Sequence, residues 1–245
     1  MITENNSFPS KNAVFRFKQM LPQFVFDASV LEGNPLTFSE VKALLEDVTV
    51  EGQKLSDVQQ VLNLAAAANT LFTLVKGEKF EVRKSIFDRL HGLVAKEEAL
   101  EWGNFRGEGA ETDYTPFVSL GEHEPYHPLP TIAGATKLNR VFSQGVEAMN
   151  EKIDNQLEYG LVFFLFGALQ QFYFDGNKRT SRFMMNGILM THGLDAISIP
   201  ARSAKSFNEK MVRFFLGRNA TEMMDFLAKC RPKDNPKPET GIFLQ

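Results

Sequence analysis

The sequence predicts an all-α fold, and three observations support this prediction. Apolar residues recur at intervals of three and four through most of the 245 residues, which is the spacing of a helix buried along one face. Alternation with a period of two, the pattern of strands, is scarce. The segment 157–174 is apolar almost all round, which in a soluble protein marks a helix buried on most of its faces. This segment is therefore expected at the centre of the fold.

Helices before this centre are predicted from caps and apolar stripes. Thr37 and Glu40 have capping-box spacing and open a short helix. Ser56 and Gln59 have the same spacing and open a longer one. Its stripe consists of Leu55, Val58, Leu62, Ala65, Ala68, Phe72 and Val75. Two further stripes comprise Ile86, Phe87, Leu90, Leu93 and Val94, and then Leu138, Val141, Phe142, Met149 and Ile153.

After the centre, the turn Asp175-Gly176-Asn177 leads into a second apolar helix from about residue 178 to residue 192. Gly193 follows, as expected of a C′ glycine. One more helix is predicted around 207–216, and a last one is opened by Asn219 and Glu222 in capping-box spacing.

Three regions are expected along the chain. Residues 1–78 form an N-terminal helical region, 79–230 a core domain, and 231–245 a flexible tail with three prolines and little to bury. A short β-hairpin is expected within 105–120, where Gly, Pro and Thr cluster.

Composition restricts the setting in which the protein works. The lone Cys230 cannot form an internal disulfide, and the N-terminus lacks the pattern of a secretory signal, so a cytoplasmic protein is expected. The longest apolar run, 159–169, is far below the ~18 residues of a membrane span, so no membrane is expected. A formal net charge of −3 argues against nucleic-acid binding. The 23 Phe residues are expected in the core, and a homodimer stays open.

The turn at 175–177 carries the chemistry. A tight turn that leads straight into a helix presents free backbone N–H groups and the positive end of the helix dipole, which together bind anions. Gly176 lets the backbone approach a ligand, and Asn177 tolerates a left-handed turn.

Three cations follow the turn. Arg179 and Arg182 share a helix face, with Lys178 beside them, so all three could address one phosphate chain. Asp175 is suited to hold Mg²⁺ that bridges the phosphates. An ordinary helix-turn-helix corner with solvated charges explains the spacing equally well.

The run Asp175-Gly-Asn-Lys-Arg-Thr-Ser-Arg182 resembles the signature of Fic (Fido) proteins, HxFx(D/E)GN(G/K)RxxR. Most of these proteins transfer AMP from ATP to a hydroxyl of a target protein. Ser29-Val-Leu-Glu32-Gly-Asn34 resembles the family's inhibitory motif, (S/T)xxxEG or SxxIEGN. Three family landmarks also stand in the expected order: Leu90-His91, Gly103-Asn-Phe-Arg106 and Tyr126-His-Pro128.

The resemblance implies a Fic-type helical fold with a hairpin flap, and a role for each motif residue. Asp175 resembles the Mg²⁺ ligand, and Gly176 and Asn177 the anion hole for the α-phosphate of ATP. Lys178, Arg179 and Arg182 resemble the nucleotide-binding cations. Glu32, in the segment that begins at Ser29, resembles the inhibitory glutamate, and an ion pair with Arg182 would occupy the guanidinium fork that ATP needs.

The pattern breaks at Gln171, which stands where the family has its catalytic histidine. An amide has no titratable nitrogen near neutral pH, so it cannot accept the proton of an attacking hydroxyl. His123 and His127 lie in the loop before the core helices and are read as solvated, and His91 and His192 as structural. Phe172 and Tyr173 also depart from the commonest motif but keep aromatic side chains.

Four functions stay open at this point, the least favoured of which is an interaction protein whose Phe-rich helices mainly mediate oligomerisation. The first is a protein adenylyltransferase that uses ATP and Mg²⁺, is restrained by Glu32 and acts on a hydroxyl side chain of an unidentified protein. The second is a catalytically weak or inactive nucleotide-binding regulatory module, because Gln171 lacks a base. The third is a phosphotransferase like the Doc branch of the family, whose members share a lysine at the position of Lys178.

Overall fold

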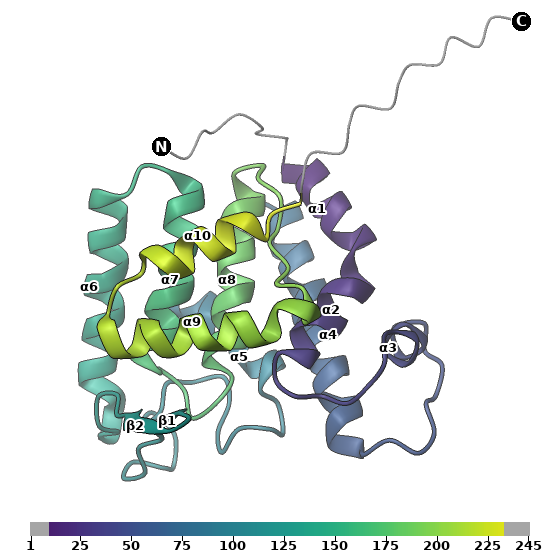
Figure 1. Cartoon of the computed structure of the whole chain (residues 1–245). Helices are drawn as coiled ribbons and strands as arrows, with labels where there is room; N and C mark the ends of the chain where they lie inside the picture. The colour runs from purple at the N-terminus through teal and green to yellow at the C-terminus, as the bar shows by residue number, and fades with distance from the viewer. Residues whose placement is uncertain (1–9, 233–245) are drawn as a thin grey trace, which may run out of the picture.

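The structure is a computed structural model and describes residues 10–232. Its described part contains ten α-helices, two 3₁₀ turns and one two-stranded antiparallel sheet (Figure 1), which confirms the predicted all-α class. The helices are α1 (Ser10–Gln19), α2 (Leu21–Val30), α3 (Phe38–Leu45), α4 (Leu55–Lys76), α5 (Lys84–Val94), α6 (Thr136–Lys152), α7 (Gln156–Gln170), α8 (Asn177–Thr191), α9 (Ala204–Gly217) and α10 (Thr221–Lys229). Residues 1–9, where no secretory signal is expected, and 233–245 of the predicted tail lie outside the described residues.

The centre of the fold is the pair α7 and α8, with α9 and α10 crossing them in Figure 1. The apolar surface of α7 accounts for its burial, and a glycine allows α8 to come close. A Cβ placed on Gly167 would lie only 2.1 Å from the Ser181 hydroxyl oxygen of α8. The predicted central helix is thus confirmed, and it is in direct contact with α8. It ends at Gln170 and not at 174 as predicted, because Gln171 adopts the left-handed conformation and the apolar residues 172–174 belong to the motif turn.

The helices α1 and α2 were not predicted individually, and they are anchored by aromatic rings. Phe17 meets Phe24 at 4.6 Å between ring centroids and Phe72 of α4 at 5.2 Å. Phe24 in turn meets Phe183 of α8 at 5.5 Å. Edge-to-face rings at these separations add attraction beyond the burial of their area. The cluster contains side chains from both sides of the proposed boundary at residue 78, and that boundary stays a prediction.

Among the described residues, α4 is the one helix long and apolar enough to cross a membrane. The search for uninterrupted apolar runs in the sequence did not identify it, because polar residues interrupt this helix. Fifty-six per cent of its most apolar 18-residue window is buried inside the fold, as in a core helix of a soluble protein. Its start also differs from the prediction. The helix begins at Leu55 after an extended Lys54 that makes no side-chain cap, so the capping box expected of Ser56 and Gln59 is wrong.

Other predicted helix ends can be checked against hydrogen bonds. Thr37 and Glu40 form both halves of their capping box on α3. Gly193 adopts φ +74° and closes α8 in a Schellman arrangement, with its N–H donating to the Met190 carbonyl. The capping box expected of Asn219 and Glu222 is wrong. Helix α10 begins at Thr221, and the Asn219 side-chain oxygen accepts a hydrogen bond from the Thr221 N–H. The Glu222 carboxylate pairs with Lys210 and Arg213 instead.

The predicted hairpin is displaced toward the C-terminus. Its strands are β1 (Val118–Leu120) and β2 (His123–Tyr126), so only β1 falls within 105–120. Before β1 the backbone is irregular because side-chain carboxylates, such as those of Glu108 and Glu111, accept its N–H groups. Tyr126 ties the hairpin to α9, with the Phe215 ring at 5.2 Å and the Arg218 guanidinium 4.2 Å above its own ring.

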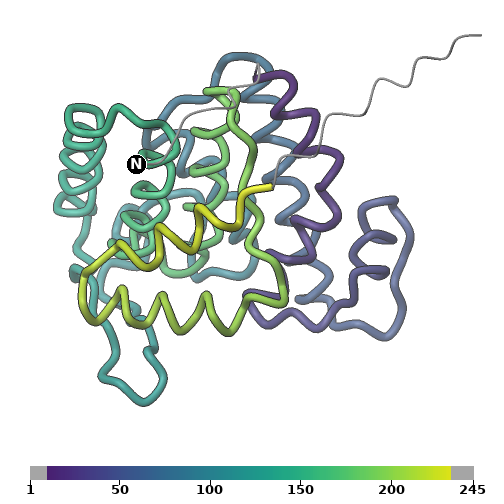
Figure 2. The backbone as a smooth tube through the Cα atoms, turned by 45° about the horizontal axis from the view of Figure 1, so that its top comes forward, coloured from purple at the N-terminus to yellow at the C-terminus, as the bar shows by residue number. Residues whose placement is uncertain are grey.

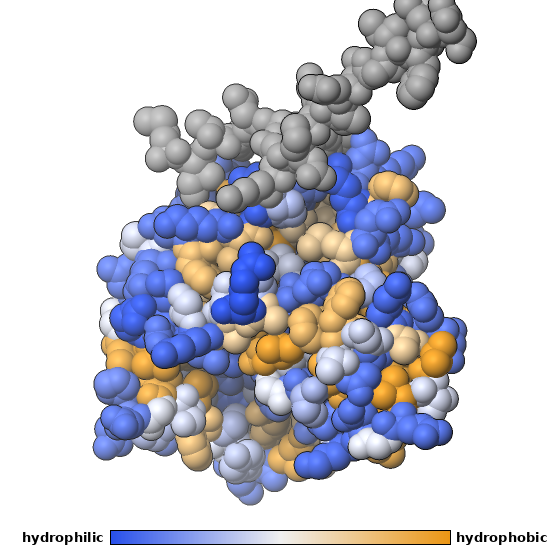
Figure 3. All heavy atoms as spheres, turned by 45° about the vertical axis from the view of Figure 1, so that its right-hand side comes forward, coloured by the Kyte–Doolittle hydropathy of each residue, from blue (hydrophilic) through white to orange (hydrophobic). Residues whose placement is uncertain are grey.

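The outer parts of the molecule are visible from two other sides. The tube in Figure 2 shows α3 at the edge of the helical body, as in Figure 1, and a teal loop that protrudes near α9. On the face in Figure 3, hydrophobic side chains lie in separate patches between hydrophilic ones. This surface agrees with a chain whose large apolar residues mostly pack inside.

Candidate active site

The motif turn lies between the end of α7 and the start of α8. Gln171 ends α7 in the left-handed conformation with φ +50°, and Gly176 caps α8 with φ +72°. Asn177 closes the loop between them: its side-chain amide donates to the Tyr173 carbonyl at 2.8 Å and accepts from the Tyr173 N–H at 2.9 Å. The turn is therefore held by its own residues. Its left-handed positions are Gln171 and Gly176, whereas Asn177, for which a left-handed conformation was allowed, is the first residue of the helix α8.

His91 holds the same turn from α5, and it is completely buried. Its Nδ1 accepts the Gly103 N–H at 3.0 Å, which leaves the proton on Nε2 to donate to the Asp175 carbonyl at 2.9 Å. Its ring stacks on Tyr173 at 3.6 Å. Burial, helped by the Arg179 charge and opposed by the bond to Asp175, lowers the pKa of His91 to about 3. The imidazole is therefore neutral and structural.

Arg106 supports the turn from the other side. Its Nε donates to the Gln171 carbonyl at 2.6 Å, its Nη1 donates to the Thr131 hydroxyl, and its backbone N–H donates to the Phe172 carbonyl. Burial lowers the pKa of this guanidinium to about 10. The landmarks His91, Gly103 and Arg106, which are weak signals one by one, thus meet at the motif turn.

A pocket of about 260 Å³ opens over the start of α8. It is lined by Glu32, Pro116, Phe117, Val118, Ser119, Gln171, Phe174, Asp175, Gly176, Asn177, Lys178 and Arg179. The first N–H groups of α8 have no acceptor within their helix, and the helix dipole adds positive potential. The pocket therefore combines the predicted anion site, from Gly176 to Arg179, with one wall of the hairpin and with the side chain of Glu32.

Glu32 reaches this pocket from the turn after α2. Its Oε1 accepts a hydrogen bond from Arg182 Nη2 at 3.2 Å, and its Oε2 lies 3.9 Å from Lys178 Nζ. The predicted Glu32–Arg182 ion pair is therefore present. It brings together residues 150 positions apart in the sequence.

The pair is largely removed from water, with the Arg182 side chain 4% and the Glu32 side chain 17% exposed. Burial raises the pKa of Glu32, but the charges of Lys178, Arg182 and Arg179 outweigh it, so this pKa lies below its ordinary value. Burial also lowers the pKa of Arg182, more than the Glu32 charge raises it. The lowered pKa of Glu32 favours its charged form, whereas the lowered pKa of Arg182 favours its neutral form. We take both side chains as charged, because the ordinary pKa of an arginine lies far above neutral pH.

Backbone contacts fix the position of Glu32. The Ser29 carbonyl accepts from the N–H groups of both Glu32 and Asn34, and Gly33 between them adopts φ +81°. The Ser29 hydroxyl donates to the Phe26 carbonyl within α2. The Asn34 side chain donates to the Asp57 carbonyl and to Gln60 of α4. The segment that carries Glu32 is thus fastened at both ends.

Arg179 is paired as well. Its Nη1 donates to Glu98 Oε2, and its Nη2 lies 3.5 Å from Asp175 Oδ2. The side chain is 3% exposed, and its Nε has no hydrogen-bond partner. Burial lowers the pKa of Arg179, but the charges of Glu32, Glu98 and Asp175 raise it above its ordinary value. Glu98 was missed by sequence reasoning, because a glutamate beside Glu97 and Lys96 looks like a solvated charge.

Gln171 has both ends of its amide engaged. Its Nε2 donates to the Ala168 carbonyl at 2.6 Å, and its Oε1 accepts from the Asn177 amide at 3.1 Å. The side chain lines the pocket and ties the end of α7 to the start of α8. In this arrangement it can position Asn177, and it has no atom that could take a proton near neutral pH.

Asp175 is the one acidic residue of the turn. Its Oδ1 accepts the Gly176 N–H at 2.6 Å, and 65% of its side chain is exposed. No group of three or more metal-ligating side chains occurs among residues 10–232. Mg²⁺ bound with a nucleotide needs only one or two carboxylates, because phosphates and waters supply the other oxygens. The exposed carboxylate of Asp175 therefore fits Mg²⁺ that arrives with phosphates, and does not fit an all-protein metal cage.

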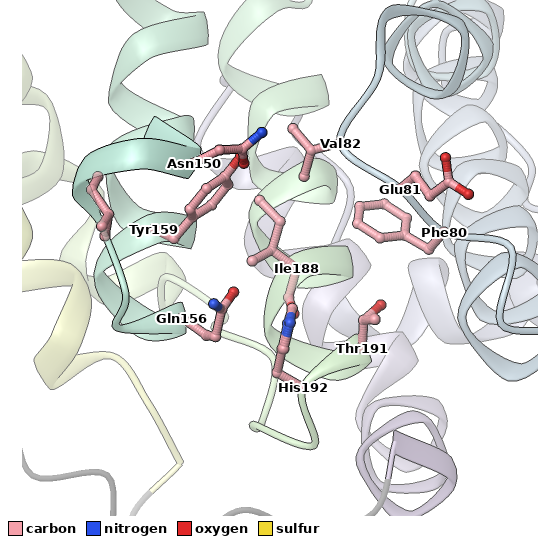
Figure 4. A pocket seen from close by; sticks show the side chains of 10 residues that line it. Phe80, Glu81, Val82, Asn150, Gln156, Tyr159, Ile188, Thr191 and His192 are labelled. Atoms are coloured by element: carbon pink, nitrogen blue, oxygen red, sulfur yellow. The ribbon is translucent and has the colours of Figure 1, made fainter. Parts of the chain in front are cut away.

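None of the other three histidines lines the pocket over the motif turn, although the His127 ring lies 6.1 Å from that of Phe117, which does. His123 and His127 belong to the hairpin region and are exposed, as predicted. His192 caps the far end of α8, where Figure 4 shows it beside a hollow of about 340 Å³ lined also by Tyr159, Asn150 and Thr191. Of the residues predicted to form the site, none lines that hollow.

Comparison with known proteins shows which proteins this chain is similar to. No family model matches the sequence. Proteins named protein adenylyltransferase Fic are similar to it: the one from Nematostella vectensis is 24% identical over 226 residues, covering 91% of this chain and 49% of its own length. The one from Aedes aegypti is 24% identical over 184 residues, covering 74% and 34%. The chain thus spans about half or less of the length of these relatives.

Solved structures show the same fold. The Caenorhabditis elegans protein Fic-1 matches with a TM-score of 0.70 at 21% identity, over 89% of this chain and 62% of that one. A Fic domain protein from Bacteroides thetaiotaomicron matches with a TM-score of 0.75 at 16% identity, over 89% and 85%. The chain thus has the fold of Fic domain proteins and is similar in sequence to proteins named protein adenylyltransferase Fic.

Proposed function

We propose that this protein binds ATP with Mg²⁺ and transfers AMP to a hydroxyl side chain of a target protein, and that Glu32 restrains it. The relatives named protein adenylyltransferase support the transfer of an adenylyl group. The observation that carries the proposal is the Glu32–Arg182 ion pair at the edge of the anion site, since it places a carboxylate where a polyanion would bind.

The residues divide the work between them. The backbone N–H groups at the start of α8, that of Asn177 included, hold the α-phosphate, and Lys178 and Arg182 neutralise the phosphates beyond it. Asp175 would hold Mg²⁺, which would neutralise negative charge on the phosphates. The hydroxyl oxygen of the target bonds to the α-phosphorus, and the bond from that phosphorus to the β-phosphate bridging oxygen breaks. Positioning and charge neutralisation supply most of the rate in such transfers.

The proton of the attacking hydroxyl cannot go to Gln171. It leaves to water or to a phosphate oxygen, and the lack of a positioned base costs about 10²–10⁴ in rate. Glu32 restrains the enzyme because ATP must take Arg182 from it and because its charge repels the phosphates. We therefore expect slow transfer that rises when Glu32 is removed.

Labelling with α-³²P-ATP and Mg²⁺ tests the proposal. The protein is incubated alone and with cell lysate, as wild type, as Glu32→Gly and as Glu32→Gly combined with Gln171→His. Label on protein is expected to increase in that order, with the histidine adding about 10²–10⁴-fold. Absence of label in all three proteins would refute adenylyl transfer. Label from γ-³²P-ATP instead would indicate a Doc-like phosphotransferase.

The engagement of the Gln171 amide by Ala168 and Asn177 favours a second candidate, a nucleotide-binding module without turnover. In that case calorimetry detects ATP binding to Glu32→Gly, whereas label appears only when Gln171 is replaced by histidine. The same set of variants therefore separates the two functions.

A further inference from the structure

Two walls of the pocket over the motif turn are joined by a chain of hydrogen bonds whose inner members do not line the pocket. Arg106 Nε donates to the carbonyl of Gln171, a lining residue, at 2.6 Å, and Arg106 Nη1 donates to the Thr131 hydroxyl at 2.9 Å. The Thr131 N–H donates to the Thr115 hydroxyl at 2.7 Å. Thr115 directly precedes residues 116–119, which line the pocket and are called the hairpin wall below. The chain therefore runs from the motif turn to the base of the hairpin.

The inner members of this chain are buried. Arg106 is 0% and Thr131 6% exposed. Within the described part of the chain, Arg106 Nη2 has no hydrogen-bond partner, so the Thr131 hydroxyl is the acceptor that fixes the outer end of the guanidinium. A hydrogen bond to a charged group is among the stronger ones, and its loss leaves a buried donor unsatisfied.

The segments that carry Arg106 and Thr131 also touch through their backbones. A Cβ placed on Gly107 would lie 2.3 Å from the Ile132 carbonyl oxygen, and the Gly107 carbonyl accepts the Gly134 N–H at 2.7 Å. The far side of the hairpin is held separately, through the ring of Tyr126 on α9, below which Figure 1 shows the two strands. The Thr131 hydroxyl is therefore not what keeps the hairpin in the fold, and its effect is on where the hairpin base lies.

The hairpin wall faces whatever extends beyond the anion site. In the proposed function the phosphates lie at the start of α8, and the rest of the pocket is lined by the hairpin wall together with Glu32, Gln171 and Phe174. The nucleoside part of ATP therefore meets the hairpin wall. A shift of this wall by 0.5–1 Å would forfeit about a quarter to a half of each van der Waals contact with it.

We propose that Arg106 and Thr131 are positioning residues: by joining the Gln171 carbonyl to the base of the hairpin, they set the distance between the hairpin wall and the motif turn, and with it the fit of the nucleoside part of ATP. The inference rests on the proposed binding of ATP. Under it, neither residue touches the nucleotide, and the binding of phosphates at the start of α8 does not depend on the chain of hydrogen bonds.

Thr131→Val is the variant that tests this role. It removes the acceptor of Arg106 Nη1, whereas the backbone N–H that bonds to Thr115 stays. Replacing Arg106 would be less informative, because its Nε and its backbone N–H also hold two carbonyls of the motif turn. Thr131→Ser keeps the hydroxyl and is the matched control. Thr73→Val is the remote control, since it removes an exposed hydroxyl of α4 that donates to the Asn69 carbonyl.

Calorimetry in the Glu32→Gly background compares ATP with inorganic triphosphate, both with Mg²⁺. In Thr131→Val the Kd of ATP is expected to rise about tenfold, the worth of one hydrogen bond to a charged group, because ATP must bring the hairpin wall back into place. The Kd of triphosphate is expected to stay within twofold, and both control variants to bind both ligands like the parent. An unchanged Kd of ATP, or an equal rise for both ligands, would overturn the proposal while ATP binding stands.

Two further measurements cover the remaining outcomes. If Thr131→Val does not fold, Thr115→Val breaks the same chain at its less buried end, and loss of ATP affinity without loss of triphosphate affinity supports the proposal, whereas no selective loss refutes it. If the parent does not bind ATP, the proposed function fails, and hydrogen exchange of residues 116–126 decides the role of the chain. Faster exchange in Thr131→Val but not in Thr131→Ser supports it, and equal exchange in the two variants refutes it.

Discussion

Replacing Glu32 by glutamine is expected to destabilise the free protein and to strengthen its response to ATP. The substitution leaves Arg182, 4% exposed, without its charged partner. Breaking a buried ion pair costs about 3–5 kcal/mol, and the residual exposure of Glu32 favours the lower end, about 3 kcal/mol. In a chain of this size each kcal/mol corresponds to about 2–4 °C, so Tm is expected to fall by about 6–12 °C.

ATP offers Arg182 a new anionic partner in the variant, whereas in the wild type it must first displace Glu32. At a thousand times its Kd a ligand adds about 4 kcal/mol to stability. Thermal unfolding followed by circular dichroism, with and without ATP and Mg²⁺, is therefore expected to show a larger ATP shift in Glu32→Gln than in wild type. The control is Glu97→Gln, an exposed glutamate that pairs with Lys96. An unchanged Tm without ATP, or equal ATP shifts, would refute the role of the ion pair.

Three more predictions concern the turn and the pH dependence of the site. The pKa of His91 is lowered in the folded state, so its contribution to stability is fully present above the unfolded pKa of about 6.5 and is lost by about 1.4 kcal/mol per pH unit as pH falls toward 3. His91→Gln should remove this slope in urea titrations between pH 4 and pH 7, and an unchanged slope would contradict it. In Gly176→Ala, the alanine must adopt φ +72°, and its Cβ lies 3.1 Å from the Cβ of Ala95. We expect the free energy of unfolding in urea to fall by about 1–2 kcal/mol and ATP binding to weaken. Wild-type values for both would count against the turn as the anion site. The pKa of Glu32 lies below 4.5, so its negative charge, and with it the proposed restraint, is lost only as pH falls below that value. The ratio of the ATP Kd values of wild type and Glu32→Gln should therefore be the same at pH 6 and pH 8. A ratio that drops at pH 6 would contradict a restraint by the charged form of Glu32.

Helices with strong stripes could be predicted from the sequence, and α1 and α2 could not. The stripe at 86–94 is α5, and the segment at 138–153 is α6. The Leu21–Val30 helix has no side-chain cap, carries a proline in its first turn and is apolar on several faces, so its sequence pattern is weak. The contacts of Phe17 and Phe24 with rings of α4 and α8 stabilise these two helices, and such contacts depend on the finished fold.

The candidate site was predictable where its residues are contiguous. Asp175 through Arg182 form one string whose spacing places the cations on a helix start, and the Glu32 pair followed from a motif. Glu98 was not predictable, because it lies in an irregular segment and only the packing of α4 brings Gln60 and Asn63 to it. Likewise, burial of the His91 ring against Tyr173 depends on contacts between positions 82 residues apart.

The way the Glu32 segment is built into the molecule has a consequence for its release. Proteolysis before residue 35 would remove Glu32, but it would also remove Phe17 and Phe24 from their cluster with Phe72 and Phe183. Removal of the proposed restraint in this way would therefore expose the apolar side of α4 and α8. A release of the proposed restraint that leaves this aromatic cluster intact would therefore move the short turn at 31–34 while α2 stays in place.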